Sequence, residues 1–389
     1  MKDRFTAAAE QLLMELLAIE GVSGEEQAIM EFMAARLRAA GVGDEAIRFD
    51  RAERRCPQGG QIGNLICKLP GTQPGPRRLL MAHADTVPLC RGARPVRRGR
   101  WIVPADKQTG LGADDRAGAA AILAVALDIL RRRLPHPPLV FLWTIQEEVG
   151  LYGARYGSLG MLGKPALAFN FDGGSTDKLT IGATGGYRMD IHVRGRASHA
   201  GVLPEQGVSA ITIAGLAIAQ LHAEGWLGRI EKQGRQGTSN IGVIQGGEAT
   251  NVVTPLVALR AEARSHDAAF RTEIVRAIAG AFRQAARAVR SSLGVCGKVR
   301  IEGHADYEAF RLADDDPSAL EAEAAVRACG GQPRRDVSNG GLDANWLSAR
   351  GIPTVTLGCG QANGHTTDER LERADFHRAC RIALQLATA

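Results

Sequence analysis

The chain has 389 residues, 45% of them apolar and 23% charged, with 48 basic side chains against 42 acidic ones. This composition is typical of a soluble globular protein with room for two domains, and it excludes a disordered chain. The basic residues are scattered and do not alternate with aromatic ones, so we expect no nucleic-acid partner. We also expect no membrane span, because no run of about 18 uninterrupted apolar residues occurs.

The cysteines and the N-terminal segment bear on the cellular compartment. The seven cysteines are widely spaced and include no CxxC pair, which predicts reduced thiols and a cytoplasmic protein. Glu10, Glu15 and Glu20 interrupt the apolar residues of the first segment. That segment therefore favours an amphipathic helix over a signal peptide.

The first 185 residues alternate between helical and extended patterns. Leucines at helical spacing predict a helix over 5–20, and Ser23 with Glu26 forms a capping box that opens a second helix ending near Gly41. An Ala-rich helix is expected over 115–131. Apolar runs predict strands at 64–69, 77–85, 138–146 and 166–172. This alternation favours an α/β fold, a mixed sheet with helices on both faces.

The pattern changes near residue 185 and returns near 310. We expect a strand and loop over 184–201, a helix over 205–224, a flexible loop over 228–240, two strands within 239–266, a helix over 267–291 and a strand over 297–310. This β-α-β-β-α-β order predicts an inserted α+β domain with a four-stranded sheet and two helices. We place the domains at 1–185, 186–306 and 307–389. The last contains a helix at 316–329, a glycine-rich turn at 339–346, a strand at 354–358 and a helix from 374.

Acidic and imidazole side chains follow several predicted strands directly. His83, Glu147 and Asp172 each stand at or just past a strand end, the edge of an open α/β sheet where ligands bind. Asp85, two residues after His83, points to the same side in extended chain. Glu147 and Glu148 are adjacent and therefore point to opposite sides, which suits two different roles. Taken alone, each group could be an ordinary hydrogen-bonded or solvated surface pair.

The motifs HADTVP, GADDRAG, QEEVGLYGA, FDGG and GHTTDE, with SHAG and NVVTP between them, resemble those of the M20 metallopeptidases. The segments EEVGLYGAR and GGLDANWLSARGIP look most like the peptidase T-like branch. The resemblance covers nearly the whole chain, with the motifs in the same order. It implies a hydrolase with two divalent metal ions.

The resemblance also assigns roles. Asp114, rather than Asp115, would bridge the ions, with a cis bond between the two residues. Asp85 would accept the second ring N–H of His83 and fix its tautomer. Glu147 would act as general base towards the attacking water. Zinc fits imidazole and carboxylate ligands best, with cobalt or manganese as alternatives. The implied sets are His83, Asp114 and Asp172 for one ion, and Asp114, Glu148 and His365 for the other.

The inserted block contributes a second group of candidates. His199 resembles the family's oxyanion donor, which often acts across a dimer interface, so a homodimer through this domain is expected. Asn251 and Arg264 resemble groups that bind the substrate backbone or carboxylate. Gly340, Gly341 and Asp343 are expected in a turn near the pocket. The alternatives are a surface histidine, a turn asparagine, an edge arginine and a purely structural turn.

The resulting hypothesis is a dinuclear exopeptidase that acts on short peptides, an aminopeptidase of the tripeptidase type. A carboxypeptidase or an N-acyl-amino-acid deacylase could use the same ligands, with N-acyl amino acids as substrates. A metal- or peptide-binding protein without activity would be expected to lack a ligand or the base, and all these positions are filled. The glycines at 182–187 lack GxGxxG spacing, which argues against a dinucleotide site.

Overall fold

The computed structural model describes residues 4–389, and these residues form two compact units. Unit 1 comprises the chain up to Gly182, Arg311–Ser338 and Leu342–Ala389, and unit 2 comprises Ala183–Phe310 and Asn339–Gly341. The sequence boundaries at 185/186 and 306/307 lie close to these divisions. The short segment 339–341, expected in the last part of the catalytic domain, groups with unit 2 instead.

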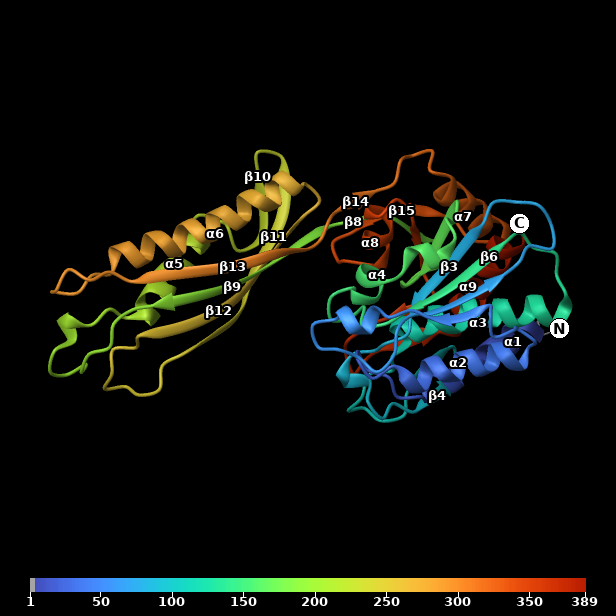
Figure 1. Cartoon of the computed structure of the whole chain (residues 1–389), viewed down its shortest axis with the longest axis horizontal. Helices are drawn as coiled ribbons and strands as arrows, with labels where there is room; N and C mark the ends of the chain where they lie inside the picture. The colour runs from blue at the N-terminus through green and yellow to red at the C-terminus, as the bar shows by residue number, and fades with distance from the viewer. Residues whose placement is uncertain (1–3) are drawn as a thin grey trace. The chain divides into compact units, whose positions relative to one another are not determined.

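Unit 1 is built on a mixed nine-stranded sheet (Figure 1). Its central strands β6, β3, β7 and β16 are parallel neighbours, and β2 and β8 pair antiparallel at either side of them. The order is β1-β2-β6-β3-β7-β16-β8-β14, with β15 paired to β8. The strands are β1 (Ile47–Phe49), β2 (Leu65–Leu69), β3 (Arg78–His83), β6 (Leu139–Thr144), β7 (Leu167–Phe171), β8 (Lys178–Ala183), β14 (Phe310–Arg311), β15 (Arg334–Ser338) and β16 (Val355–Leu357).

Helices pack on both faces of this sheet, as expected of the α/β class. On one face α3 contacts β3, β6 and β7 directly, and α1, α2 and α9 pack against α3. On the other face α4 and α8 lie over an apolar cluster that includes Met81, Leu142 and Leu347. The helices are α1 (Arg4–Leu17), α2 (Gln27–Ala39), α3 (Ala113–Arg132), α4 (Tyr152–Tyr156), α7 (Pro317–Ala328), α8 (Asp343–Ala349) and α9 (Arg373–Thr388).

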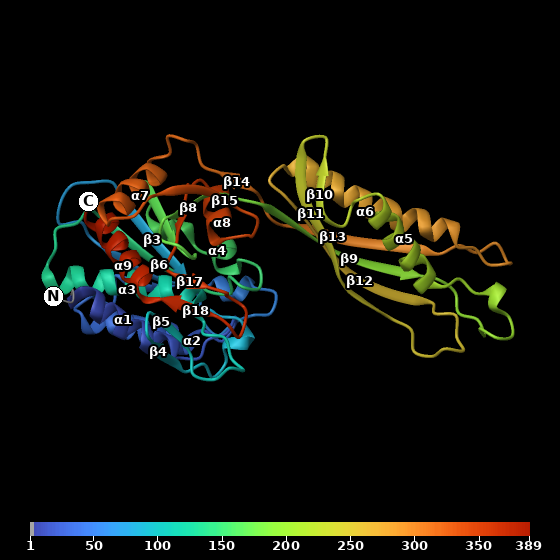
Figure 2. The same ribbon diagram turned by 180° about the vertical axis from the view of Figure 1, so that it is seen from behind.

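A second, small antiparallel sheet in unit 1 joins two segments far apart in the sequence. Figure 2 shows β4 and β5 beside β17 and β18. It connects the segment before Asp114 to the loop that carries His365. Its strands are β4 (Pro95–Arg98), β5 (Trp101–Pro104), β17 (Gln361–Ala362) and β18 (Arg370–Glu372).

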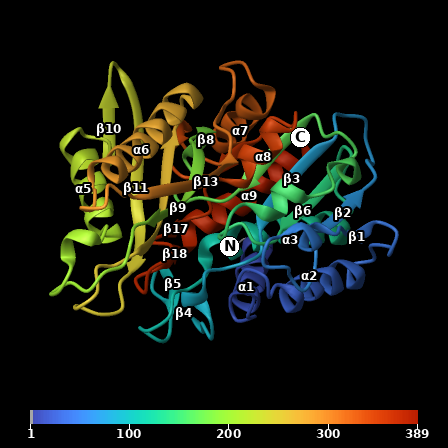
Figure 3. The same cartoon turned by 60° about the vertical axis from the view of Figure 1, so that its left-hand side comes forward.

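Unit 2 is an antiparallel sheet with two helices on one face (Figure 3). Alternate residues of β9 and β12 are buried against α5 and α6, and the residues between them are largely exposed. The strand order is β10-β11-β12-β9-β13. The elements are β9 (Gly185–Arg194), α5 (Ala210–Ala223), β10 (Gly228–Lys232), β11 (Arg235–Gly246), β12 (Leu256–Ser265), α6 (Ala268–Ala288) and β13 (Lys298–Tyr307).

Two sequence predictions were wrong. The stretch 228–240 is a β-hairpin rather than a flexible loop, so the sheet of unit 2 has five strands instead of four. Gln233 and Gly234 both have positive φ, as a two-residue hairpin turn requires. Only Ile230 of β10 is buried, so this edge strand carries no apolar pattern. Ser23 and Glu26 do not form a capping box, because α2 begins without a side-chain cap.

Candidate active site

Three neighbouring parallel strands bring the predicted residues of unit 1 together. β3 lies between β6 and β7, and all three run in the same direction. His83 is the last residue of β3, Asp172 follows β7, and Glu147 comes three residues after the end of β6. Because carboxyl ends of parallel strands meet at one edge, residues nearly ninety positions apart become neighbours there.

The start of α3 supplies the fourth group at this edge. Asp114 and Asp115 have non-helical backbone angles, and the peptide bond between them is cis, as expected. One turn later, Gly118 lies so close to the carbonyl of Phe171 that a Cβ would meet its oxygen. This glycine therefore lets α3 approach β7, the strand that precedes Asp172.

The loop after β17 supplies the last group, His365. Its Nε2 lies 2.8 Å from Oε1 of Glu148 and 3.5 Å from Oδ2 of Asp114. The neighbouring Gly364 leaves room for the carboxylate, because a Cβ there would stand 2.9 Å from Oδ2 of Asp114. His365 itself has a positive φ of 63°. The glycine and this unusual backbone direct the imidazole towards the two acids.

The five predicted ligand residues form two overlapping triads, which we call the ligand cluster. In each triad the ligand atoms lie within 4.8 Å of one another, and Asp114 belongs to both. Its Oδ1 lies 3.3 Å from Nε2 of His83, and its Oδ2 faces His365. The triads are His83, Asp114 and Asp172, and Asp114, Glu148 and His365. This is the pairing that the family resemblance implied.

The ring of His83 is held by the main chain more closely than by the Asp85 carboxylate. Its Nδ1 lies 3.1 Å from the carbonyl oxygen of Asp85 and 3.5 Å from its Oδ1. An N–H at Nδ1 would donate to that carbonyl and leave Nε2 free for the cluster. Although burial opposes the charged ring, Asp114 and Asp85 raise the pKa of His83 well above its ordinary value.

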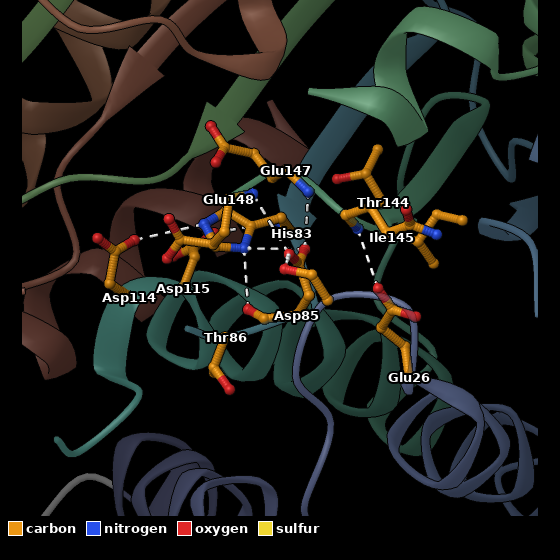
Figure 4. Close-up of polar contacts among 12 residues, drawn as sticks. Glu26, His83, Asp85, Thr86, Asp114, Asp115, Thr144, Ile145, Glu147 and Glu148 are labelled. Carbon is orange, nitrogen blue, oxygen red and sulfur yellow. Dashed lines mark hydrogen bonds and ion pairs between the residues drawn. The ribbon is translucent and has the colours of Figure 1, made fainter. Parts of the chain in front are cut away.

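The Asp85 carboxylate holds the chain that carries both glutamates (Figure 4). Its Oδ1 accepts the backbone N–H of Glu147 at 3.0 Å, and its Oδ2 accepts that of Glu148 at 3.3 Å. The Ser23 hydroxyl donates to the same Oδ2 at 2.7 Å. Asp85 is fully buried, yet its contacts with His83 and Ser23 keep its pKa low. Asp85 is therefore a charged carboxylate that is held in place behind the ligand cluster.

The cluster concentrates negative charge in a partly buried place. Burial first, and then neighbouring acids, raise the pKa of Glu147 well above its ordinary value and that of Asp172 to about 7. The hydrogen bond to Glu148 raises the pKa of His365 to about 9. Acids held this close repel one another unless a proton or a cation lies between them. The oxygen and nitrogen donors, arranged in two triads, fit two divalent cations.

The unit 2 candidates fall into two groups that lie at opposite ends of one sheet. His199 pairs with Val252 in an isolated bridge, and the N–H of Ala200 donates to the carbonyl of Asn251. Both residues are exposed: His199 follows the end of β9, and Asn251 precedes the start of β12, which pairs with that end. Arg264 lies near the other end, where it pairs with Gly186 and binds both carboxylate oxygens of Glu262.

Gly341 and Asp343, in the segment 339–346, both make contacts that support the fold. Gly341 packs against the ring of Tyr307, where a Cβ would come within 2.4 Å of the ring. Asp343 is the first residue of α8 and is 1% exposed, and its Oδ2 accepts a hydrogen bond from the Thr144 hydroxyl. Such burial favours a supporting role for Asp343 over contact with a substrate.

Sequence reasoning missed two buried acids beside the cluster. Glu369 accepts the N–H groups of Leu111 and Gly112 at 2.7 and 2.8 Å, and that of Asp114 at 3.1 Å. Glu26 accepts the N–H of Gln146 at 3.0 Å. Glu369 closes the GHTTDE motif, so the motif itself was the available signal. For Glu26 the sequence pattern indicated a helix cap instead.

Comparison with known proteins identifies the family of the chain. Residues 79–389 match the model of peptidase family M20/M25/M40. Over 98% of both chains, the structure resembles a tripeptidase from Staphylococcus aureus (30% identity, TM-score 0.88) and the aminopeptidase PepT from Bacillus cereus (31%, 0.84). The uncharacterized protein YqjE of Bacillus subtilis is 34% identical over 310 residues, 79% of this chain and 80% of that protein.

An α/β unit with two triads of imidazole and carboxylate groups at one edge of its sheet defines a metallopeptidase with an inserted α+β unit. The chain belongs to peptidase family M20/M25/M40, and its peptidase T-like character is confirmed by the similarity to the tripeptidase and PepT structures.

Proposed function

We propose that this chain is an aminopeptidase of the tripeptidase type, which releases the N-terminal residue of short peptides. The observation that carries the proposal is the pair of triads sharing Asp114, with Glu147 next to Glu148. The peptide preference is supported by the similarity, at 30–31% identity over 98% of the chain, to structures described as a tripeptidase and an aminopeptidase.

His83, Asp114 and Asp172 would hold one ion, and Asp114, Glu148 and His365 the other, with zinc as the proposed metal. When bound, such ions polarise a scissile carbonyl and lower the pKa of an attacking water. Glu147 then takes the proton of that water and delivers it to the leaving amine. Asp85 fixes the backbone of both glutamates, and His199 donates to the oxyanion. Asn251 and Arg264 are proposed to bind the substrate.

A panel of substrates tests the proposal. Tripeptides with a free N-terminus should be hydrolysed, and the same peptides with an acetylated N-terminus should not, because an aminopeptidase requires the free amine. Release of the N-terminal residue is measured by mass spectrometry, with dipeptides and N-acyl amino acids in parallel. Hydrolysis of N-acyl amino acids alone would contradict the aminopeptidase proposal.

Glu147→Gln is the test of the proposed base. The amide cannot accept the proton, so kcat should fall by about 10²- to 10⁴-fold, while two metal ions per chain remain bound. Metal content is measured by elemental analysis of the purified variant. The exposed Glu45 offers a matched control, since Glu45→Gln should leave kcat unchanged. A wild-type rate in Glu147→Gln would remove this residue from the mechanism.

A carboxypeptidase or deacylase is the second candidate. Carboxypeptidase G2 from a Pseudomonas strain is 26% identical over 68% of this chain and 63% of that protein. The same substrate panel separates the two candidates, because a carboxypeptidase accepts a blocked N-terminus and requires a free carboxylate.

We also propose a cytoplasmic homodimer. The location is supported by seven cysteines that form no disulfide within residues 4–389. No helix in those residues is long and apolar enough to cross a bilayer. The dimer is supported by Ile211 and Leu216 on α5, two apolar side chains that are 49% and 48% exposed.

A further inference from the structure

The turn between α1 and α2 reaches the residues behind the ligand cluster. Glu26 is fully buried, and its Oε1 accepts the N–H of Gly24 at 2.8 Å and that of Gln146 at 3.0 Å. Its Oε2 has no hydrogen-bond partner in the described part of the chain. Figure 4 shows this carboxylate directed at the segment that follows Thr144. Burying a carboxylate with an unpaired oxygen is unfavourable, and the contacts within the local turn do not by themselves explain why an acid stands here.

Gln146, the residue that Glu26 contacts, has an unfavourable backbone conformation. Its φ is +50°, in the left-handed region that residues other than glycine rarely adopt. Gln146 is fully buried, and its side chain donates to the carbonyl of Gly59 at 2.7 Å and accepts from Gln58 at 3.2 Å. Such a conformation persists only where the surroundings hold it.

Three consecutive backbone N–H groups therefore donate hydrogen bonds to two buried carboxylates. The N–H of Gln146 is bound by Glu26, and those of Glu147 and Glu148 are bound by Asp85. Asp85 is held in turn by Ser23, from the same turn that carries Glu26. The left-handed residue stands directly before the proposed base and the proposed ligand. Its backbone angles consequently decide where both glutamate side chains point.

We propose that Glu26 is a positioning residue, which holds Gln146 in the left-handed conformation and thereby aims Glu147 and Glu148. The contribution to catalysis rests on the proposed function; the contribution to backbone geometry does not. Burial and the charge of Asp85 raise the pKa of Glu26 to about 7. Both its neutral and its charged forms can accept the N–H of Gln146 at Oε1.

Replacement of Glu26 separates positioning from metal binding. Glu26→Leu removes the acceptor at nearly constant volume, and kcat should fall by about 10- to 100-fold, with KM unchanged and two metal ions still bound at saturating metal. Glu26→Gln keeps an acceptor oxygen and should restore kcat to within about threefold of the wild type. The adjacent Glu25→Gln, which loses only an exposed pair with Arg91, is the matched control. A wild-type kcat in Glu26→Leu would overturn the proposal.

A double-mutant cycle tests the route through Gln146. Glycine adopts positive φ without penalty, so in Gln146→Gly the left-handed conformation no longer depends on the hydrogen bond to Glu26. Glu26→Leu should therefore cost several-fold less in kcat in the Gln146→Gly background than in the wild type. Equal losses in both backgrounds would show that Glu26 acts elsewhere.

Hydrogen exchange tests the geometry without any substrate. In the wild-type protein the amide of Gln146 should be strongly protected, and Glu26→Leu should accelerate its exchange while distant core amides remain unchanged. Rapid exchange of this amide in the wild type would overturn the proposal even if no variant folds. If the wild type hydrolyses nothing in the panel, the proposed function fails and this measurement still decides the role of Glu26.

Discussion

At the scale of single residues, buried carboxylates organise the backbone around the ligand cluster. Glu369 is 1% exposed and receives three amide groups of the segment 111–114, including that of Asp114 itself. Because Glu369 and His365 share one loop, this contact also ties the two ends of one triad together. A supporting contact of this kind orients a metal ligand without itself binding the metal.

Glu369→Ala should therefore weaken the binding of metal ions that depend on Asp114. The loop amides lose their buried acceptor, and we expect affinity for at least one of the two ions to fall by about 10- to 100-fold. Calorimetric titration of the metal-free protein measures this directly. Glu372→Ala, a partly exposed neighbour outside the cluster, should bind both ions normally. Identical titration curves for the wild type and Glu369→Ala would contradict the prediction.

At the scale of elements, the first and last helices are joined through one buried acid. Glu10 on α1 is 4% exposed and binds Arg97 at 2.6 Å, Arg373 at 3.0 Å and His377 at 2.8 Å. Burial alone would raise its pKa, but Arg373, Arg97 and His377 together lower it to about 2. The contact connects α1 to β4 and α9, through residues that lie 87 and 363 positions from Glu10 in the sequence.

Replacing Glu10 should destabilise unit 1 in a pH-dependent way. Because the folded pKa lies below the ordinary value of 4.5, the charged form stabilises the fold fully above that pH and progressively less as the pH falls through about 2. Glu10→Gln should therefore lower the free energy of unfolding by about 2 kcal/mol at pH 7, discounted for the half-exposed arginines. Urea unfolding at pH 7 and pH 3 measures the difference. The exposed Glu31→Gln should change stability by less than about 0.5 kcal/mol.

At the scale of the whole molecule, the geometry of unit 2 bears on how His199 acts. The chain enters this unit at Ala183 and leaves it at Phe310, and the paired ends of β9 and β13 at Gly186 and Tyr307 adjoin these points. His199 follows the opposite end of β9, a ten-residue strand about 33 Å long. In the proposed homodimer, His199 would serve the active site of a second copy of the chain.

Mixing two inactive variants tests that arrangement. A dimer of His199→Ala with Glu147→Gln would contain one complete site if His199 acts across the interface. Random exchange of subunits should then restore about a quarter of wild-type activity. Activity is measured on a tripeptide, with light scattering to establish the oligomeric state. A mixture that stays inactive after subunit exchange would place His199 and Glu147 of one chain in the same site.

The sequence by itself determined the α/β class and the inserted unit and, through the resemblance of its motifs to the M20 family, the five residues of the ligand cluster. These follow from apolar periodicity and from short motifs, both of which are local properties of the chain. Tertiary structure alone decided how Asp85, Glu369 and Glu26 are used, because their partners are backbone amides from segments 62 to 258 residues away. Every residue except proline carries a backbone N–H group, so no residue type marks such a partner. The hairpin at 228–240 escaped prediction for a related reason, since an exposed edge strand buries too little to show an apolar pattern.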